Sequence, residues 1–367
     1  MTTPSENRFL KRLQEGKPIL MAEGYIFELE RRGCIQAGPF CPIILLEEPE
    51  MIKQVTRDYV NNGSDVIVAC TYYANDAKFK TINRDDPCIL ETFNRKALEI
   101  AWEVAREAGN EDVLVCGDIS NSTSFLLEDK SSHETVYEMF LKIAQYAKEG
   151  NCDFILSETI DSIAESLLAL KAIKAVGLPA VCNVTFGPDN RTRDGYGIEE
   201  AVKILKENGA DVVGTNCNRG PATMLPVLKK IREAVDGPIC GAPSIYRTTP
   251  EEPFFMTLTD KNCCAPWGRP FPTALEPFSC TRYEAADFAK QASELGVQLI
   301  GLCCGNGPHH TRAAAEALGR VTKRSKYSPD MSKHFMLGNN KNQTKEYLAW
   351  GKVMKGETEK NETNETC

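Results

Sequence analysis

The chain has 367 residues, of which 42% are hydrophobic and 26% are charged, so it can bury a sizeable apolar core. Its formal net charge of -8 at pH 7 argues against nucleic acid or an anionic membrane as a partner, since both attract basic surfaces. No run of about 18 apolar residues occurs, and the first residues lack the apolar stretch of a signal peptide. We therefore expect a cytoplasmic protein that does not span a membrane.

Short apolar runs rich in β-branched residues recur along the chain and predict strands. They cover residues 19–25, 65–73, 113–119, 152–159, 178–186, 210–217, 238–244 and 297–305. The runs are almost continuously apolar, which is typical of parallel strands buried on both faces. Amphipathic segments lie between them, and several end in a glycine just before the next strand, where helices commonly stop.

Eight strands that alternate with helices predict an α/β protein built as a single (β/α)8 TIM barrel. An open, doubly wound sheet is the alternative, but the chain lacks the G-x-G-x-x-G turn that follows the first strand of many such sheets. We assign residues 1–322 to the barrel. Residues 323–367 form a polar C-terminal extension, whose last dozen residues are expected to be disordered.

A long segment, residues 245–280, follows the seventh predicted strand. It is rich in proline and aromatic residues and is too long for an ordinary βα loop. The loops that follow barrel strands lie at the C-terminal mouth, where active sites are found. We therefore expect this segment to lie over the mouth, and the sequence leaves open whether it acts as a lid.

Fifteen cysteines are many for a chain without an export signal, in which a disulfide framework is not expected. Most of them lie inside predicted strands or in loops and fit small buried hydrophobic residues. Three lie at strand ends, Cys217 on the sixth strand and the pair Cys303 and Cys304 on the eighth. Three thiolates suit zinc, and they leave a fourth coordination position open for a substrate.

Adjacent cysteines on a regular strand point to opposite faces, so Cys303 and Cys304 can hold one ion only if the strand breaks there. Three glycines close to the pair give the backbone this freedom. The competing interpretation is that all three strand-end cysteines are structural core residues. His309 and His310 follow the pair, and we expect them to cap a helix or face the surface rather than bind metal.

Several motifs resemble those of the homocysteine methyltransferase family. GLCCGNGPHHTRAAAEALG is similar to the family's GGCCG signature, and VGTNCNRGP resembles its upstream zinc-cysteine motif. The segments AEGYIFELERRGCIQAGPFCP, GSDVIVACTYYAND, NCDFILSET and KYSPDMSK resemble the betaine–homocysteine branch. The resemblance covers roughly residues 15 to 335 and implies a TIM-barrel enzyme that methylates homocysteine to methionine.

The resemblance also implies roles for residues on the acceptor side. Zinc would be held by Cys217, Cys303 and Cys304, with the sulfur of homocysteine as the fourth ligand, kept as a thiolate by the metal. Glu23 and Glu158 would bind the amino group of homocysteine, and Glu158 counts with the zinc cysteines among the catalytic residues. The competing interpretations are a solvated loop carboxylate for Glu23 and a structural acid for Glu158.

The methyl donor of this family is usually an onium ion, which binds well among aromatic rings. Tyr73 and Phe40 match the family's donor-side aromatic residues, although either could be plain packing. Glycine betaine is the expected donor and would leave dimethylglycine. However, Phe40 replaces a tryptophan typical of betaine users, so a sulfonium donor such as dimethylsulfoniopropionate or S-methylmethionine is the alternative.

Two further departures from the betaine type bear on the site and the assembly. Family members carry Asp-Gly where this chain has Ala22 and Glu23, so the carboxylate is retained but moved by one residue. The chain also lacks several dozen residues before KYSPDMSK, a region that helps to form a dimerisation arm in the betaine enzymes. The sequence therefore leaves open whether the chain forms a homo-oligomer.

Three other functions compete with this hypothesis. The same homocysteine-binding barrel could receive its methyl group from a methyl-corrinoid or a methyl-folate on a partner protein, although the chain has no D-x-H-x-x-G cobalamin motif. A non-catalytic zinc-binding or thiol-sensing barrel is the alternative from another class, but a sensor needs no amino-acid pocket. A Schiff-base aldolase is disfavoured because none of the eight strand ends carries a lysine.

Overall fold

The structure, a computed structural model, describes residues 7–84, 86–109, 112–339 and 341–357. The chain divides into two compact units, residues 1–323 and 324–367. Among the described residues, no helix is both long and apolar enough to cross a membrane.

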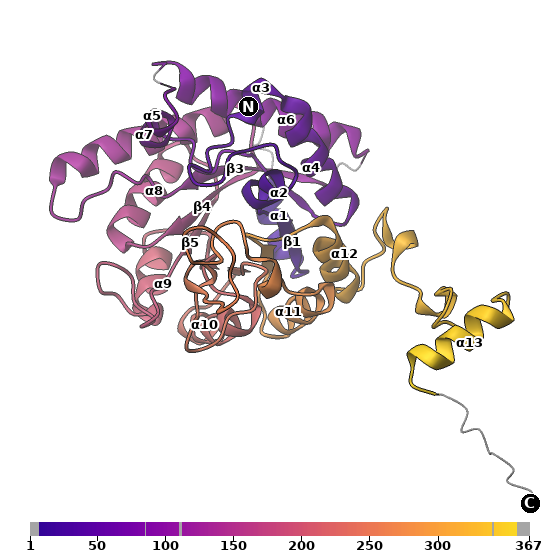
Figure 1. The fold of residues 1–367 in the computed structure, drawn as a ribbon. Coiled ribbons are helices and arrows are strands. Elements are labelled where there is room, and N and C mark those ends of the chain that lie inside the picture. Colours follow the sequence, from indigo (N-terminus) through magenta and orange to yellow (C-terminus); the bar gives the residue numbers. More distant parts are fainter. Residues whose placement is uncertain (1–6, 85, 110–111, 340, 358–367) are drawn as a thin grey trace, which may run out of the picture. The chain divides into compact units, whose positions relative to one another are not determined.

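The first unit is a closed barrel of eight parallel strands, which confirms the predicted fold class (Figure 1). Strand β1 pairs with both β2 and β8, and this double pairing closes the barrel. Each strand lies within one of the predicted apolar runs or extends one residue beyond it. The strands are β1 (Ile19–Ala22), β2 (Val66–Val68), β3 (Leu114–Ser120), β4 (Phe154–Ile160), β5 (Ala180–Val184), β6 (Val212–Asn216), β7 (Ile239–Ala242) and β8 (Leu299–Leu302).

Helices surround the strands and cover their outer face (Figure 1). The longer ones are amphipathic, and α4 buries Ile52, Val55 and Tyr59 against the barrel. Local capping sets several starts, such as the capping box of Thr281 and Glu284 on α11. The helices are α1 (Arg8–Gln14), α2 (Tyr25–Arg31), α3 (Ile44–Glu47), α4 (Pro49–Asn61), α5 (Asp76–Thr81), α6 (Ile89–Glu107), α7 (Lys130–Glu149), α8 (Ile163–Ala175), α9 (Ile198–Glu207), α10 (Pro221–Ala234), α11 (Arg282–Glu294) and α12 (Pro308–Ala317).

Helix α1 packs at the N-terminal end of the strands. The ring of Phe9 stacks on Phe154 with 3.9 Å between the ring centroids. Asp153, just before β4, accepts a hydrogen bond from the backbone N–H of Val115 at 2.8 Å and pairs with Arg8 at 3.3 Å. This end of the barrel is therefore packed and its buried acid is paired, which leaves the opposite end for function.

The long segment between β7 and α11 contains two short 3-10 helices, η1 (Phe255–Thr257) and η2 (Glu276–Phe278). Phe255 and Phe271 from this segment pack against Phe27, with centroid distances of 5.8 and 6.4 Å. Phe27 lies on α2, directly after the first strand, so the segment does extend over the C-terminal mouth as expected. It forms an aromatic cluster there that is separate from the main core.

The second unit contains η3 (Ser325–Tyr327), η4 (Met331–Lys333) and α13 (Lys345–Met354). The Thr344 side chain caps α13, and the ring of Phe335 meets Tyr347 edge-on at 5.3 Å. Helix α13 was not predicted from the sequence of this polar extension. The predicted disorder of the last dozen residues falls mainly on residues 358–367, which lie outside the described residues.

Candidate active site

The three strand-end cysteines converge at the mouth of the barrel. Cys217 directly follows β6, and Cys303 and Cys304 directly follow β8. The Sγ of Cys304 lies 3.6 Å from that of Cys217 and 3.9 Å from that of Cys303, and all three sulfurs lie within 4.8 Å of one another. Tetrahedral zinc with Zn–S bonds of about 2.3 Å holds sulfurs about 3.8 Å apart. The three thiols therefore fit one zinc ion with little rearrangement.

Unusual backbone conformations bring the thiols together. Cys217 and the next residue, Asn218, both have φ of 56°, in the left-handed region that non-glycine residues seldom adopt. Gly305 has φ of 79°, and a Cβ there would lie 2.6 Å from the ring of Tyr246. The strand break expected after the cysteine pair is therefore present, and it needs a glycine at position 305.

Hydrogen bonds among the thiols favour one negative charge in the cluster. The thiols of Cys303 and Cys304 donate to Cys217, and this holds the pKa of Cys217 well below its ordinary value. The same interaction with the Cys217 thiolate raises the pKa of the other two. Ser244 adds a hydroxyl that donates to Cys217 Sγ at 3.6 Å. A buried site that already stabilises a thiolate suits a cation as its ligand.

Two buried carboxylates lie beside the thiols. Glu23 follows β1, Glu158 lies on β4, and their oxygens are within 4.8 Å of each other and of Cys303 Sγ. Asn216 Nδ2 donates to Glu158 at 2.6 Å, whereas neither oxygen of Glu23 has a hydrogen-bond partner. Burial raises the pKa of Glu23 well above its usual range, and burial followed by the charge of Cys217 raises that of Glu158 to about 7. Such a pair would be stabilised by a ligand cation.

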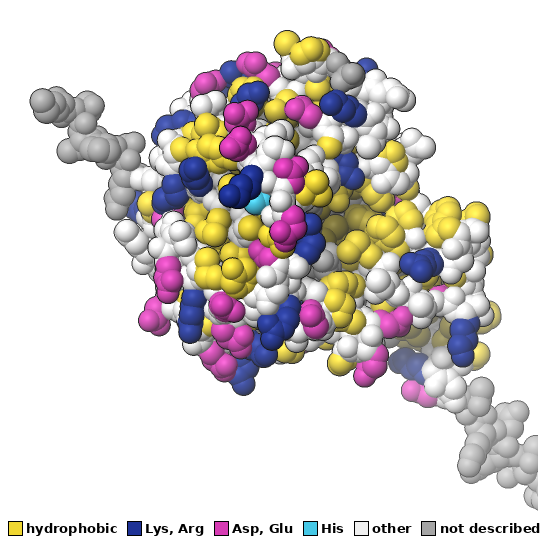
Figure 2. All heavy atoms as spheres, turned by 90° about the vertical axis from the view of Figure 1, so that its left-hand side faces the viewer, with side chains coloured by type: hydrophobic (Ala, Val, Ile, Leu, Met, Phe, Trp, Pro, Cys, Tyr) yellow, Lys and Arg dark blue, Asp and Glu magenta, His cyan; other side chains and the backbone are white. Residues whose placement is uncertain are grey.

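All seven predicted site residues line one cavity of about 450 Å³ at the barrel mouth. They are Glu23, Phe40, Tyr73, Glu158, Cys217, Cys303 and Cys304. Figure 2 shows a hollow in the face on the left of Figure 1, with hydrophobic side chains gathered around it. Six of the nine described non-glycine residues with positive φ also line the cavity. These six are Phe40, Tyr73, Thr123, Thr159, Cys217 and Asn218.

Aromatic rings form part of the cavity wall. Phe40 stacks on Phe27 at 5.2 Å between centroids, and Tyr73 contacts Tyr72 at 4.3 Å in a tilted arrangement. The ammonium of Lys78 lies 4.1 Å from the centroid of the Tyr73 ring and occupies one of its faces. Tyr72 lines the cavity too, but the sequence analysis did not identify it, since adjacent strand-end tyrosines do not reveal which side each one faces.

Two polar residues inside the barrel were not predicted from the sequence. Asp118 on β3 and Asn216 on β6 are buried, and Asp118 lines the cavity. A charged residue within the apolar run 113–119 was the available signal for Asp118, because buried charges are rare without a partner or a function. Asn216 directly precedes Cys217 and bonds to Glu158 across the barrel.

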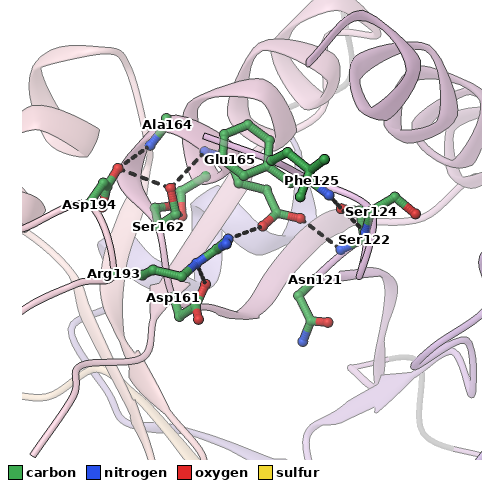
Figure 3. Close-up of polar contacts among 12 residues, drawn as sticks. Asn121, Ser122, Ser124, Phe125, Asp161, Ser162, Ala164, Glu165, Arg193 and Asp194 are labelled. Atoms are coloured by element: carbon green, nitrogen blue, oxygen red, sulfur yellow. Dashed lines mark hydrogen bonds and ion pairs between the residues drawn. The ribbon is translucent and has the colours of Figure 1, made fainter. Parts of the chain in front are cut away.

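Figure 3 shows a cluster of charged side chains, of which Asp161, Glu165 and Arg193 line the cavity. Arg193 Nε donates to Asp161 at 3.1 Å, and its Nη2 lies 3.8 Å from the buried carboxylate of Glu165. Glu165 also accepts a hydrogen bond from Ser122 N at 2.7 Å. Among the described residues that line the cavity, Arg193 is the one basic side chain, against five carboxylates (Glu23, Asp118, Glu158, Asp161 and Glu165). The cavity therefore favours positively charged groups.

His310 has the capping role expected from the sequence. Its Nδ1 accepts a hydrogen bond from Gly307 N at 3.1 Å, which leaves Nε2 to donate to the carbonyl of Cys280 at 2.9 Å. Burial, followed by the positive charge of its neighbour His309, lowers the pKa of His310 to about 3. This neutral histidine fixes the start of α12 just after the cysteine pair, and neither ring nitrogen is available for a metal.

Residues 21–318 match the family model of homocysteine S-methyltransferase. The chain belongs to the homocysteine S-methyltransferase family. It is 34% identical to betaine–homocysteine S-methyltransferase 1 of Danio rerio, over 86% of this chain and 76% of the relative. Identity to the Xenopus tropicalis enzyme of the same name is 33%, over 92% and 81% of the two chains.

A relative with a different donor in its name is more distant. The S-methylmethionine–homocysteine S-methyltransferase BHMT2 of Mus musculus is 28% identical, over 93% of this chain and 89% of the relative. The metallated form of the Escherichia coli homocysteine methyltransferase MmuM shares the fold, with a TM-score of 0.66 at 19% identity, over 84% of this chain and 99% of that one. The chain is therefore a homocysteine S-methyltransferase of the TIM-barrel type, which confirms the resemblance found in the sequence.

Proposed function

We propose that the protein transfers a methyl group from glycine betaine to homocysteine with the help of zinc, giving dimethylglycine and methionine. The observation that supports this most directly is one cavity in which three thiols at zinc-binding separations lie beside two buried carboxylates. The first group of residues suits a metal and the second suits the ammonium of an amino acid. Their proximity matches homocysteine, whose thiol and amino group belong to one small molecule.

Cys217, Cys303 and Cys304 would hold the zinc. When bound, zinc supplies a Lewis acid that keeps the homocysteine sulfur deprotonated at neutral pH, where a free thiol is mostly protonated. The protein's own contribution is to hold the three thiols together through the strained backbone at Cys217 and the break at Gly305. Because this arrangement needs reduced cysteines, we also propose that the protein works in the cytoplasm.

Glu23 and Glu158 would orient the acceptor by binding its ammonium. Both carboxylates are buried, and an ammonium between them would offset their mutual repulsion. Asn216 fixes the direction of Glu158 through its 2.6 Å bond. Fixing the amino-acid end of homocysteine fixes the position of its sulfur, so that it can attack the methyl carbon in line.

The donor would bind on the aromatic side of the cavity. Phe40 and Tyr73 line this side together with Phe255 and Phe271 of the long segment after β7. Aromatic faces attract onium ions, and the surplus of carboxylates adds to this attraction. Transfer of the methyl group cancels the positive charge of the donor and the negative charge of the sulfur, which is favoured in a cavity shielded from water.

A sulfonium carboxylate, such as dimethylsulfoniopropionate or S-methylmethionine, is the second candidate donor. The supporting observation is Phe40, which is packed between Phe27 and Phe271, with 5.2 and 6.5 Å between the ring centroids. A phenyl ring is a weaker cation platform than an indole. The relative named for S-methylmethionine supports the same alternative.

The test is methionine formation by the zinc-loaded protein from homocysteine, with glycine betaine, dimethylsulfoniopropionate and S-methylmethionine in parallel reactions. A zinc assay on the same sample gives the stoichiometry. Turnover with glycine betaine at one zinc per chain would support the proposal, and turnover with only a sulfonium donor would select the second candidate. Bound zinc without turnover on any of the three would refute both donors and direct attention to a corrinoid partner.

A further inference from the structure

Asp118 is a buried acid beside which the described residues place no cation. It lies on β3 with 3% of its surface exposed, and neither carboxylate oxygen has a partner at normal hydrogen-bond distance, although Glu158 and Thr71 are near enough to shift its pKa. It lines the cavity that holds the three thiols and the two site glutamates. Because an isolated carboxylate inside a protein is strongly unfavourable, such a residue needs an explanation.

Asp153 shows what a structural acid looks like in the same barrel. It is buried at the opposite end, where it accepts a hydrogen bond from Val115 N at 2.8 Å and pairs with Arg8 at 3.3 Å. Within the part of the chain that the structure describes, Asp118 has no such cation and no such N–H. The difference indicates that the partner of Asp118 comes from outside the protein, as a ligand in the cavity.

The position of Asp118 identifies the kind of ligand. In the pairing of β3 with β4, Ser120 lies opposite Glu158. Asp118 precedes Ser120 by two residues, so its side chain lies on the same face of β3, one inward-facing position nearer to the N-terminal end of the barrel. The charges of Glu158 and Asp118 are also the two largest electrostatic influences on Glu23. Three carboxyl groups thus lie in one cavity, close enough to affect one another's charge, and no hydrogen-bond donor lies within normal distance of the oxygens of Glu23 and Asp118.

A primary ammonium carries three N–H donors, which matches three carboxyl groups. We propose that Asp118 is a third binding residue for the ammonium of the amino-acid acceptor, together with Glu23 and Glu158. This inference rests on the proposed function, in which homocysteine occupies the cavity. It requires Asp118 to bind as a carboxylate, and the positive charge of the ammonium favours that form.

The inference is tested with the zinc-loaded protein and the variant Asp118→Asn. Calorimetric titration would measure the affinity for homocysteine and for 4-mercaptobutyrate, which has the thiol and the carboxylate but no ammonium. We expect the variant to bind homocysteine roughly tenfold to a hundredfold more weakly, since one bond between charged groups is lost. Its affinity for 4-mercaptobutyrate should stay the same.

Thermal unfolding of the ligand-free proteins gives a second readout that does not depend on activity. The melting temperature of Asp118→Asn should rise, because the substitution removes a buried acid without a partner. Asp153→Asn is the matched control, and it should melt earlier while binding both ligands like the wild type. If Asp118→Asn does not fold, Asp118→Ser replaces it with the same expectation for the two ligands.

The outcomes separate this inference from the proposed function. An equal loss of affinity for both ligands would mean that Asp118 has only a structural role, and no loss for either would mean that it does not reach the ammonium. Either result overturns the inference while turnover by the wild type keeps the proposed function. A wild-type protein that does not bind homocysteine would overturn the proposed function and this inference with it.

Discussion

Asn216 should contribute several kcal/mol to the free energy of unfolding, because its side chain links β6 to β4 at the site. Its side-chain oxygen accepts from Thr159 N at 2.9 Å, and its Nδ2 donates to Glu158 at 2.6 Å and to the Thr159 hydroxyl at 3.0 Å. A bond to a carboxylate contributes about 1.5 to 3 kcal/mol and a neutral bond about 1 kcal/mol. Asn216→Ala would remove all three, leave the Thr159 N–H without its acceptor, and leave the buried carboxylate of Glu158 with only the Thr159 hydroxyl at 3.2 Å as a donor.

Asn183 on β5 is the matched control for this substitution. It is equally buried, but its Nδ2 contacts only the sulfur of Cys240 at 3.3 Å, and its oxygen has no partner. Truncation to alanine leaves a similar cavity at both positions, so the difference between the variants isolates the hydrogen bonds.

We expect Asn216→Ala to lose about 3 kcal/mol more unfolding free energy than Asn183→Ala, from the bond strengths above. The assay is urea unfolding at pH 8, where Glu158 is ionised, since its pKa is about 7. The homocysteine KM of Asn216→Ala should rise as well, because Glu158 loses its fixed direction. A difference in unfolding free energy below about 1 kcal/mol would refute the reasoning that these bonds stabilise the fold.

Three further predictions concern the metal, the histidine cap and the strand break. Cys217→Ala should lose zinc, measured by metal analysis, and at least a thousandfold in turnover, and full zinc content would contradict the assigned ligands. The pKa of His310 is lowered from 6.5 to about 3, so the unfolded chain binds the extra proton first as the pH falls. Its stabilising contribution is complete above pH 6.5 and should fall below it by up to about 1.4 kcal/mol per pH unit, a slope that His310→Gln should lack in urea unfolding. Gly305→Ala should lower the unfolding free energy by about 2 kcal/mol, because position 305 has φ of 79° and lies against an aromatic ring. That variant should also bind zinc more weakly, and unchanged zinc affinity would contradict a role for the break in placing the thiols.

The sequence predicted the barrel and its cysteines because both follow from local patterns. Each strand is an apolar run that is followed by an amphipathic segment typical of a helix. Because the active sites of such barrels lie at the C-terminal ends of strands, Cys217, Cys303 and Cys304 could be selected from the sequence. Glu23 was predicted from the resemblance to the family, and in the structure it directly follows β1. Patterns of this kind depend only on neighbouring residues, so one chain is enough to read them.

The residues that were missed depend on how the strands align with one another. Asp118 and Asn216 face the interior because closure of the barrel fixes the stagger of β3 and β6, and no local pattern encodes that stagger. The left-handed backbone at Cys217 is likewise imposed by the tertiary structure, since cysteine has no preference for it. Helix α13 was missed for a different reason, because its polar, charged surroundings resemble a disordered tail.

The concentration of left-handed residues at the mouth affects how the protein should respond to heat and to mutation. Each such residue other than glycine or asparagine is less favourable by about 1 to 2 kcal/mol than in an ordinary conformation, and the packed barrel below holds it in place. If the packing of the barrel weakens, the six left-handed residues that line the cavity can return to ordinary backbone conformations before any strand separates. Catalysis should therefore fail at a lower temperature than the fold does, and a mutation far from the cavity that merely weakens packing should first appear as lost activity in a protein that is still folded.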